Sequence, residues 1–122
     1  MKTRNILLIT SDKELSGIVK ISALTLTKLN TQISIDEAED NENALEKSKS
    51  ELIDLIIFDG DTKNTDPIML IHEIRKNVNS NNKKIIFIYS EFVNREAVFK
   101  AGCDSIMSRE EFKRVINNIL TI

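Results

Sequence analysis

The chain has 122 residues, of which 41% are hydrophobic and 30% charged, and its 17 basic and 19 acidic side chains give a formal net charge of -2. That length suits one globular core, so we expect a single domain over residues 1–122. The mixed charges form no basic field, and we expect neither nucleic acid nor a membrane as a direct partner.

The single cysteine and the first apolar stretch indicate the cellular compartment of the protein. Cys103 has no second cysteine with which to form an internal disulfide, and no zinc-ligand spacing surrounds it. The apolar run Ile6–Ile9 is shorter than the roughly 7–15 residues of a secretion signal. We therefore expect a cytoplasmic protein.

The first half of the chain alternates strand and helix patterns. Ile6–Ile9 reads as a buried strand, and the residues from Leu15 to Leu29 then repeat apolar positions about every 3.6 residues, as an amphipathic helix does. Gln32–Asp36 alternates polar and apolar residues, which indicates an edge strand with one wet face. Leu55–Phe58 is apolar throughout, which is typical of a strand covered on both faces.

The second half continues the alternation. Ile85–Tyr89 is another buried strand, and Ser105–Met107 is a short fifth one. Helical spacing is found before and after them, at Leu70, Ile71, Ile74 and Val78, and at Phe112, Val115, Ile116, Ile119 and Leu120.

Boundary residues agree with five strand–helix units. Ser11 with Glu14 forms a capping-box pair, Asp66 before Pro67 is a helix N-cap followed by a first-turn proline, and Gly102 can close the preceding helix. Alternating units of this kind predict a mostly parallel sheet with right-handed crossovers and helices on both faces.

Polar residues follow the predicted strands at one common edge. In an open parallel sheet, sites lie outside the carboxyl ends of the strands. Thr10, Ser11 and Asp12 follow the first strand, Asp59–Asp61 ends the third, Ser90 ends the fourth, and Arg109 follows the fifth. We expect these groups to meet, with Asp59 at the mouth of the sheet.

Each candidate also has a structural interpretation. Asp59 and Arg109 could form a buried ion pair that never meets phosphate, and Ser11 and Asp12 could simply start the first helix. Ser90 could be a turn serine. Of the remaining residues with reactive side chains, His72 is expected on the surface and Cys103 as a small packed residue.

The order of these motifs resembles the CheY-like receiver domain of two-component response regulators. The resemblance rests on Glu37–Leu45, on Asp59–Arg75 and on Ala101–Asp104, and it covers essentially the whole chain. It implies a flavodoxin-like, doubly wound α/β fold, (βα)5, with a five-stranded parallel sheet in the order 2-1-3-4-5. It also implies that Asp59 is the phosphoacceptor and Ser90 the switch hydroxyl, with Arg109 where the family usually has lysine.

The metal site is where the sequence departs from that family. Receivers usually end the first strand with two adjacent carboxylates that hold Mg²⁺, whereas Thr10 and Ser11 stand there and Asp12 follows one residue late. The remaining metal ligands would be Asp12, Asp59 and Asp61, the last through its carbonyl or side chain. Hydroxyls do not supply the charge that offsets Mg²⁺ dehydration, so we expect weaker binding.

The resemblance also implies partners for a signalling domain that is not an enzyme. A histidine kinase or phosphotransfer protein would supply the phosphoryl group, and a downstream protein or effector domain would bind the face of helix 4, strand 5 and helix 5. Ile106 stands where the family usually has an aromatic switch residue. A degenerate receiver, acting as a phosphorylation-independent protein-binding domain, is therefore the alternative.

Two further alternatives come from other motifs. Asp59, Asp61 and Thr62 form a DxDxT pattern similar to haloacid-dehalogenase-like phosphatases, in which Asp59 would attack and Asp61 would act as acid and base. No acidic pair follows a late strand, because Glu110 and Glu111 lie on the predicted last helix. The second alternative is a flavin-binding or nucleotide-binding module of the same architecture, but Gly17, Gly60 and Gly102 form no phosphate-binding loop.

Overall fold

The computed structural model describes residues 2–29, 31–63, 65–76, 83–90 and 93–121. Over these ranges strands and helices alternate as the sequence predicts. Their bounds are β1 Lys2–Ile9, α1 Lys13–Lys28, β2 Thr31–Ala38, α2 Asn41–Ser48, β3 Leu55–Asp59, α3 Pro67–Lys76, β4 Lys84–Tyr89, α4 Arg95–Ala101, β5 Ser105–Ser108 and α5 Arg109–Thr121.

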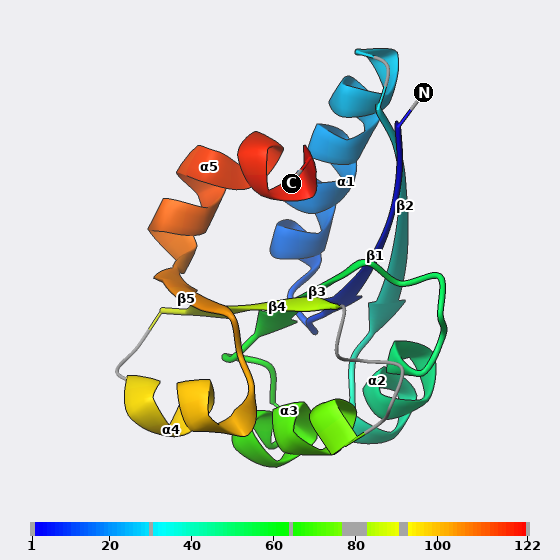
Figure 1. Ribbon diagram of the computed structural model, residues 1–122. Coiled ribbons are helices and arrows are strands. Elements are labelled where there is room, and N and C mark those ends of the chain that lie inside the picture. Colours follow the sequence, from blue (N-terminus) through cyan, green and yellow to red (C-terminus); the bar gives the residue numbers. More distant parts are fainter. Residues whose placement is uncertain (1, 30, 64, 77–82, 91–92, 122) are drawn as a thin grey trace.

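The strands form one parallel sheet in the order β2-β1-β3-β4-β5. Helices α1 and α5 cover one face, and α2, α3 and α4 cover the other (Figure 1). This arrangement confirms the predicted flavodoxin-like fold. Because the strands are parallel, their carboxyl ends lie along a single edge of the sheet.

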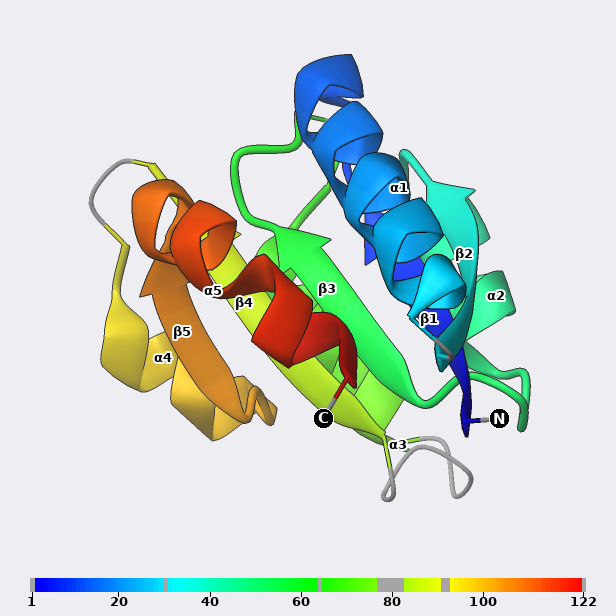
Figure 2. The same ribbon diagram turned by 90° about the horizontal axis from the view of Figure 1, so that it is seen from above.

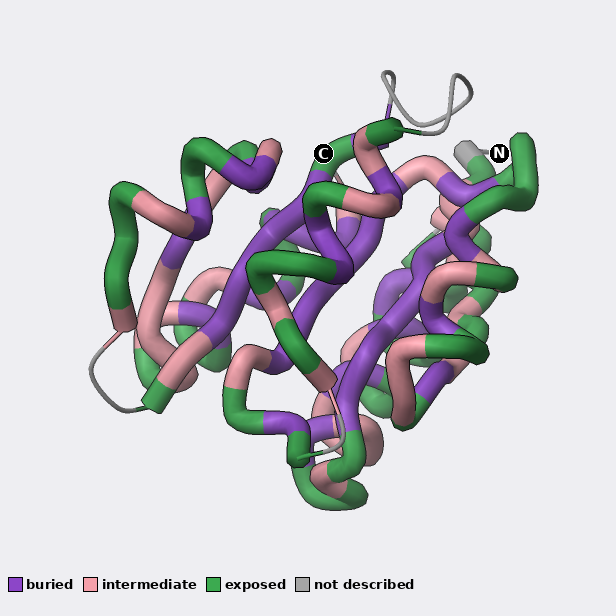
Figure 3. The backbone as a smooth tube through the Cα atoms, turned by 90° about the horizontal axis from the view of Figure 1, so that it is seen from below, coloured by how far each residue is buried: buried purple, intermediate pink, exposed green. Residues whose placement is uncertain are grey.

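Two apolar layers hold the sheet between the helices. Successive residues of a strand point to opposite faces, so Leu7 and Ile9 of β1 belong to the layer under α2, α3 and α4, while Ile6 and Leu8 belong to the layer under α1 and α5. All five residues of β3 are buried. The buried parts of the backbone run through the middle of the molecule (Figure 3).

Strand β2 lies at an edge of the sheet, as its alternating pattern predicts. Its residues alternate between half-buried and exposed from Thr31 to Glu37. Ile33 and Ile35 pack against the layer under α1. Viewed from above, α1 lies along β1 and β2, and α5 along β4 (Figure 2).

The helix boundaries confirm two predicted signals and correct one. Asp66 accepts a hydrogen bond from the amide of Met69 as α3 begins at Pro67, and Gly102 ends α4 with a positive φ of 124°. The predicted capping box at Ser11 is wrong, because the N-cap of α1 is Asp12. Val78, predicted on the third helix, lies outside the described residues.

The remaining residues with reactive side chains are placed as expected. His72 is exposed on α3, and Cys103 is buried, with its thiol donating to the carbonyl of Ser105 at 2.8 Å. In the described part of the chain, no helix combines the length and apolar character needed to cross a lipid bilayer.

Candidate functional site

The polar strand ends meet at the carboxyl edge of the sheet. Asp59 is the last residue of β3, beside Ile88 of β4, and its carboxylate contacts side chains that follow β1 and β5. Thr10 comes from the first of these and Arg109 from the second. The expected association of Asp59 with Arg109 is therefore present in the structure.

Asp59 is almost fully buried, with 1% of its surface exposed. Its Oδ2 accepts hydrogen bonds from Thr10 Oγ1 at 2.6 Å and from Arg109 Nη2 at 3.3 Å. Its Oδ1 accepts from the Asp61 amide at 3.0 Å and from Arg109 Nη1 at 3.3 Å. A carboxylate offers about four acceptor positions. Asp59 lies at the sheet edge as predicted, but donors already occupy its lone pairs.

Arg109 joins three carboxylates that come from different strand ends. Its Nη2 lies 2.5 Å from Asp12 Oδ2 and 3.3 Å from Asp59 Oδ2, and its Nε lies 3.5 Å from Asp61 Oδ2. Only 17% of the arginine side chain is exposed. Arg109 begins α5, so the planar guanidinium spans from the start of the last helix to β1 and β3. The predicted ion pair between Asp59 and Arg109 is therefore present, and Arg109 also pairs with Asp12 and Asp61.

Asp12 both starts a helix and holds the arginine. Its Oδ1 accepts from the amides of Glu14 and Leu15, and its Oδ2 accepts from Arg109. Partial burial raises the pKa of Asp12, but the hydrogen bonds from Arg109 and the two amides outweigh it, so its pKa lies below the ordinary value. The carboxylate is thereby kept ionised.

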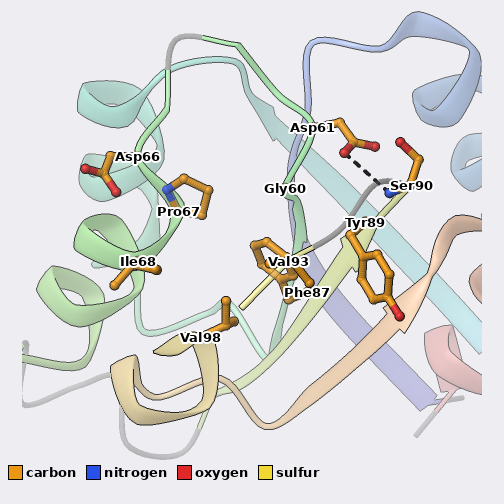
Figure 4. Close-up of a pocket in the computed structure, with 10 residues that line it drawn as sticks. All are labelled: Gly60, Asp61, Asp66, Pro67, Ile68, Phe87, Tyr89, Ser90, Val93 and Val98. Atoms are coloured by element: carbon orange, nitrogen blue, oxygen red, sulfur yellow. Dashed lines mark hydrogen bonds between the residues drawn. The ribbon is translucent and has the colours of Figure 1, made fainter. Parts of the chain in front are cut away.

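Ser90 lies just beyond the end of β4 and is exposed. Its amide is 3.4 Å from Asp61 Oδ1, and Figure 4 shows the two residues facing each other at one end of a cavity. The residue that ends β4 is Tyr89. Its hydroxyl points away from Asp61, and the centre of its ring lies 6.0 Å from the guanidinium carbon of Arg95. The switch role of Ser90 stays a prediction.

The cavity lies beside the carboxylate cluster and has a volume of about 390 Å³. Phe87 forms part of its wall below Gly60 (Figure 4), and a Cβ atom on Gly60 would lie 2.2 Å from the Phe87 ring. Glycine is thus required next to Asp59 if Phe87 keeps its place. The cavity is lined by Gly60, Asp61, Asp66, Pro67, Ile68, Phe87, Tyr89, Ser90, Val93 and Val98.

The structure adds roles that sequence reasoning missed. Thr10 was expected near Asp59 and at a replaced acid position, but not as a hydrogen-bond partner; it donates to Asp59 and accepts from the Asp12 amide at 3.0 Å. Ser108 Oγ accepts from the Glu111 amide and so caps α5. The sequence places Arg109, Asp12 and Asp61 at the same edge of the sheet, but it does not indicate that Arg109 pairs with both carboxylates.

The phosphatase interpretation gains nothing from this geometry. Asp61, which would act as acid and base, is paired with Arg109. The hydroxyl of Thr62 is buried without a hydrogen-bond partner in the described structure. Glu110 and Glu111 lie on the first turn of α5, as the sequence predicts, and form no acidic pair at a strand end.

The donor set does not fit a divalent metal as it stands. Among the described residues, no three His, Cys, Asp or Glu side chains form a group that could hold a metal ion. The oxygens of Asp59 already accept four hydrogen bonds, and Thr10 supplies a hydroxyl donor where Mg²⁺ would need an anionic ligand. Ser11, at the other replaced position, is exposed.

Comparison with known proteins identifies the fold. No protein-family model matches the chain, and no curated protein matches it significantly. Among solved structures, the receiver domain of the sensor histidine kinase PA1611 from Pseudomonas aeruginosa, with a magnesium ion in its active-site cleft, matches with a TM-score of 0.80 at 18% identity, over 98% of this chain and 95% of that one. The chain has the receiver-domain fold.

Two other solved structures lead to the same fold. The phosphorylated cyanobacterial phytochrome response regulator RcpA matches with a TM-score of 0.77 at 12% identity, over 96% of this chain and 91% of that one. A two-component response regulator from Clostridium difficile matches with a TM-score of 0.72 at 24% identity, over 97% and 96% of the two chains. The receiver fold thus accounts for nearly the whole chain.

Proposed function

We propose that this chain is a receiver-type domain of two-component signalling that accepts a phosphoryl group on Asp59. The observation that carries the proposal is the placement of Asp59 at the carboxyl end of β3, in contact with Thr10 and Arg109, on a fold shared with phosphorylated response regulators. A histidine kinase or phosphotransfer protein supplies the phosphoryl group, and a partner binds the face of α4, β5 and α5.

The chemistry is an in-line displacement at phosphorus. An Asp59 oxygen forms the new O–P bond while the bond from phosphorus to the donor nitrogen breaks, and the leaving imidazole nitrogen takes up a proton from solvent water. Thr10 and Arg109 must first release that oxygen, because they occupy it in the structure. The guanidinium then binds two phosphoryl oxygens in parallel, a geometry that suits arginine.

Incubation with phosphoramidate, followed by intact mass measurement, tests the acceptor. The wild type is expected to gain the mass of one phosphoryl group, and Asp59→Asn is expected to gain none. Asp61→Asn is the matched control, because it removes a neighbouring carboxylate that contacts the same arginine. Equal labelling of wild type and Asp59→Asn, or no labelling of either, would contradict the acceptor role.

A second function is supported by the burial of Asp59. With 1% exposure and its oxygens bonded to four donors, the carboxylate also suits a protein-binding domain that works without phosphorylation. In that case Asp59→Asn leaves the affinity for the partner unchanged. Phosphoramidate labelling combined with a pull-down of the partner by wild type and Asp59→Asn therefore separates the two functions.

A further inference from the structure

We infer that Arg109 is the built-in counter-ion of the Asp12, Asp59 and Asp61 carboxylates and that it keeps divalent cations out of this site. The inference goes beyond the proposed function, since it concerns what the site binds before any phosphoryl group arrives. It also marks a difference from the Pseudomonas receiver, which holds a magnesium ion in its active-site cleft.

The first step is the distribution of contacts around the guanidinium. Its three nitrogens face three carboxylates: Nη2 lies near Asp12 and Asp59, Nη1 near Asp59, and Nε near Asp61. Arginine is suited to this role because its donors are fixed in a plane and its charge persists at any physiological pH. One side chain therefore satisfies, at the same time, the anionic groups that could otherwise ligate a metal.

The second step is the state of Asp59. Each of its oxygens accepts two hydrogen bonds, from Thr10, from the Asp61 amide and twice from Arg109. A metal ion could bind Asp59 only by displacing one of these donors. If Thr10 is displaced, its hydroxyl is left without a partner while the residue is only 4% exposed. Burial of such an unpaired polar group is unfavourable.

The third step is charge. A divalent cation at Asp59 would lie next to the guanidinium, and like charges repel strongly where water is largely excluded. The hydroxyls of Thr10 and Ser11 bring no negative charge to offset this repulsion. The carboxylate of Asp12 is no substitute, since one of its oxygens caps α1 and the other holds Arg109.

Titration with Mn²⁺ tests the inference, with free Mn²⁺ counted by electron paramagnetic resonance. The wild type is expected to show no saturable binding at millimolar Mn²⁺. Arg109→Met, which keeps the length of the side chain and removes its charge, is expected to bind Mn²⁺ saturably, with a dissociation constant roughly tenfold or more below the highest concentration at which the wild type shows no binding, because the repulsion is gone. Adding Asp59→Asn to Arg109→Met should abolish that gain and so locate the ion.

Two results would overturn the inference. One is saturable Mn²⁺ binding by the wild type that Asp59→Asn removes, and this result needs no arginine variant to fold. The other is a folded Arg109→Met protein, checked by circular dichroism, whose Mn²⁺ affinity equals that of the wild type. Neither measurement uses a phosphoryl donor, so failure of Asp59 to accept phosphate leaves the metal result unaffected.

Discussion

At the scale of single residues, the hydroxyl of Thr10 is the clearest support of the site. It donates to Asp59 at 2.6 Å and accepts from the amide of Asp12 at 3.0 Å. Thr10→Val keeps the shape and removes both bonds, and a hydrogen bond to a charged group contributes about 1.5–3 kcal/mol. We expect that loss in the free energy of unfolding, measured by urea denaturation.

Thr10→Ser is the control for this prediction. Serine keeps the hydroxyl and loses only a methyl group, which costs about 0.8 kcal/mol when buried. If Thr10→Val is no less stable than Thr10→Ser, then the hydroxyl of Thr10 does not support Asp59 as described.

Cys103 allows a second prediction at the residue scale. Burial, the largest influence, raises the pKa of its thiol to about 11, and 7% of its surface is exposed. Because the thiolate is the reactive form, the native protein at pH 8 should react with Ellman's reagent far more slowly than the protein in denaturant. Lys13→Cys, at an exposed position and in a Cys103→Ser background, should react rapidly without denaturant. Equal rates for the two thiols would contradict the burial of Cys103.

The individual site residues could be predicted from the sequence only in part. Asp59 and Arg109 stood out because Asp59 ends an apolar strand and Arg109 follows the short fifth strand, and the parallel sheet does bring them together. The bridge from Arg109 to Asp12 could not be read from local pattern, since the two residues are 97 positions apart in the chain. Which carboxylates one guanidinium reaches depends on its rotamer and on distances between strands that only the folded chain sets.

At the scale of helices and strands, the end of α4 requires a glycine because its backbone adopts a positive φ there. Gly102 has a φ of 124°, and a Cβ atom there would lie 2.4 Å from Cγ of Arg75. Arg75 donates to the carbonyls of Gly102 and Lys83 and pairs with Asp104, so moving it disturbs several bonds. Gly102→Ala is expected to lower the free energy of unfolding by about 1–3 kcal/mol, the usual cost of such backbone strain.

Gly17→Ala is the matched control in the same chain. Gly17 lies inside α1, and a Cβ atom there meets nothing within 4 Å. Alanine in a helix interior is favoured over glycine by about 1 kcal/mol, so this variant should be more stable than the wild type. Urea denaturation of both variants measures the difference, and a loss of stability in Gly17→Ala would show that the two positions do not differ as described.

Glu37 ties β2 to α1 and should give the protein part of its acid sensitivity. The hydrogen bond from Ser16, and then the contacts with Lys20, hold the pKa of Glu37 below its ordinary value of 4.5. A lowered pKa in the folded state gives stability that is full above the unfolded value and is lost as the pH falls through the folded value. With 35% of the side chain exposed, we expect less than about 1 kcal/mol from this contact.

Urea denaturation at a series of pH values below 6 measures this contribution. Glu37→Gln should show a shallower loss of stability on acidification than the wild type. Glu39→Gln, at an exposed neighbouring carboxylate, controls for the loss of one negative charge. Parallel pH profiles for wild type and Glu37→Gln would rule out the proposed stabilisation.

The strands and helices themselves could be predicted well because each depends on local periodicity. The apolar runs Leu55–Phe58 and Ile85–Tyr89 are predicted as strands, and both lie within strands of the structure. The sequence does not distinguish the two candidate starts of α1, because Ser11 and Asp12 are both good N-cap residues. In the structure Asp12 accepts the hydrogen bonds of the Glu14 and Leu15 amides and also pairs with Arg109. The ion pair with Arg109 is a tertiary contact that no local pattern indicates.

At the scale of the whole molecule, the strand order came from the resemblance to receivers rather than from periodicity. Alternating strands and helices predict a parallel sheet, but several orders satisfy that pattern. The observed order β2-β1-β3-β4-β5 places β1 and β3 side by side. Because these strands are neighbours, Thr10, which follows β1, can contact Asp59 at the end of β3. The site therefore depends on topology that the local sequence leaves open.

The two apolar layers should unfold as one unit because they share the same strands. Phe112 of α5 is fully buried in the layer under α1 and α5, whereas Tyr89 packs against the opposite layer. Phe112→Ala should cost about 3–5 kcal/mol, and a two-state domain should lose its far-UV circular dichroism and the fluorescence of Tyr89 at the same urea concentration. Tyr89 is a clean reporter because the chain has one tyrosine and no tryptophan.

Phe99→Ala is the control for the loss of an aromatic ring. Phe99 lies on α4 with 46% of its surface exposed, so its truncation should change stability by no more than about 0.5 kcal/mol. In Phe112→Ala, the cavity opens on the face of the sheet away from Tyr89, and a shift of both signals to the same lower midpoint would show that the sheet couples its two layers. Separate midpoints would mean that each layer unfolds independently, and Asp59, at the end of a strand that the layers share, would then lose its support in two stages.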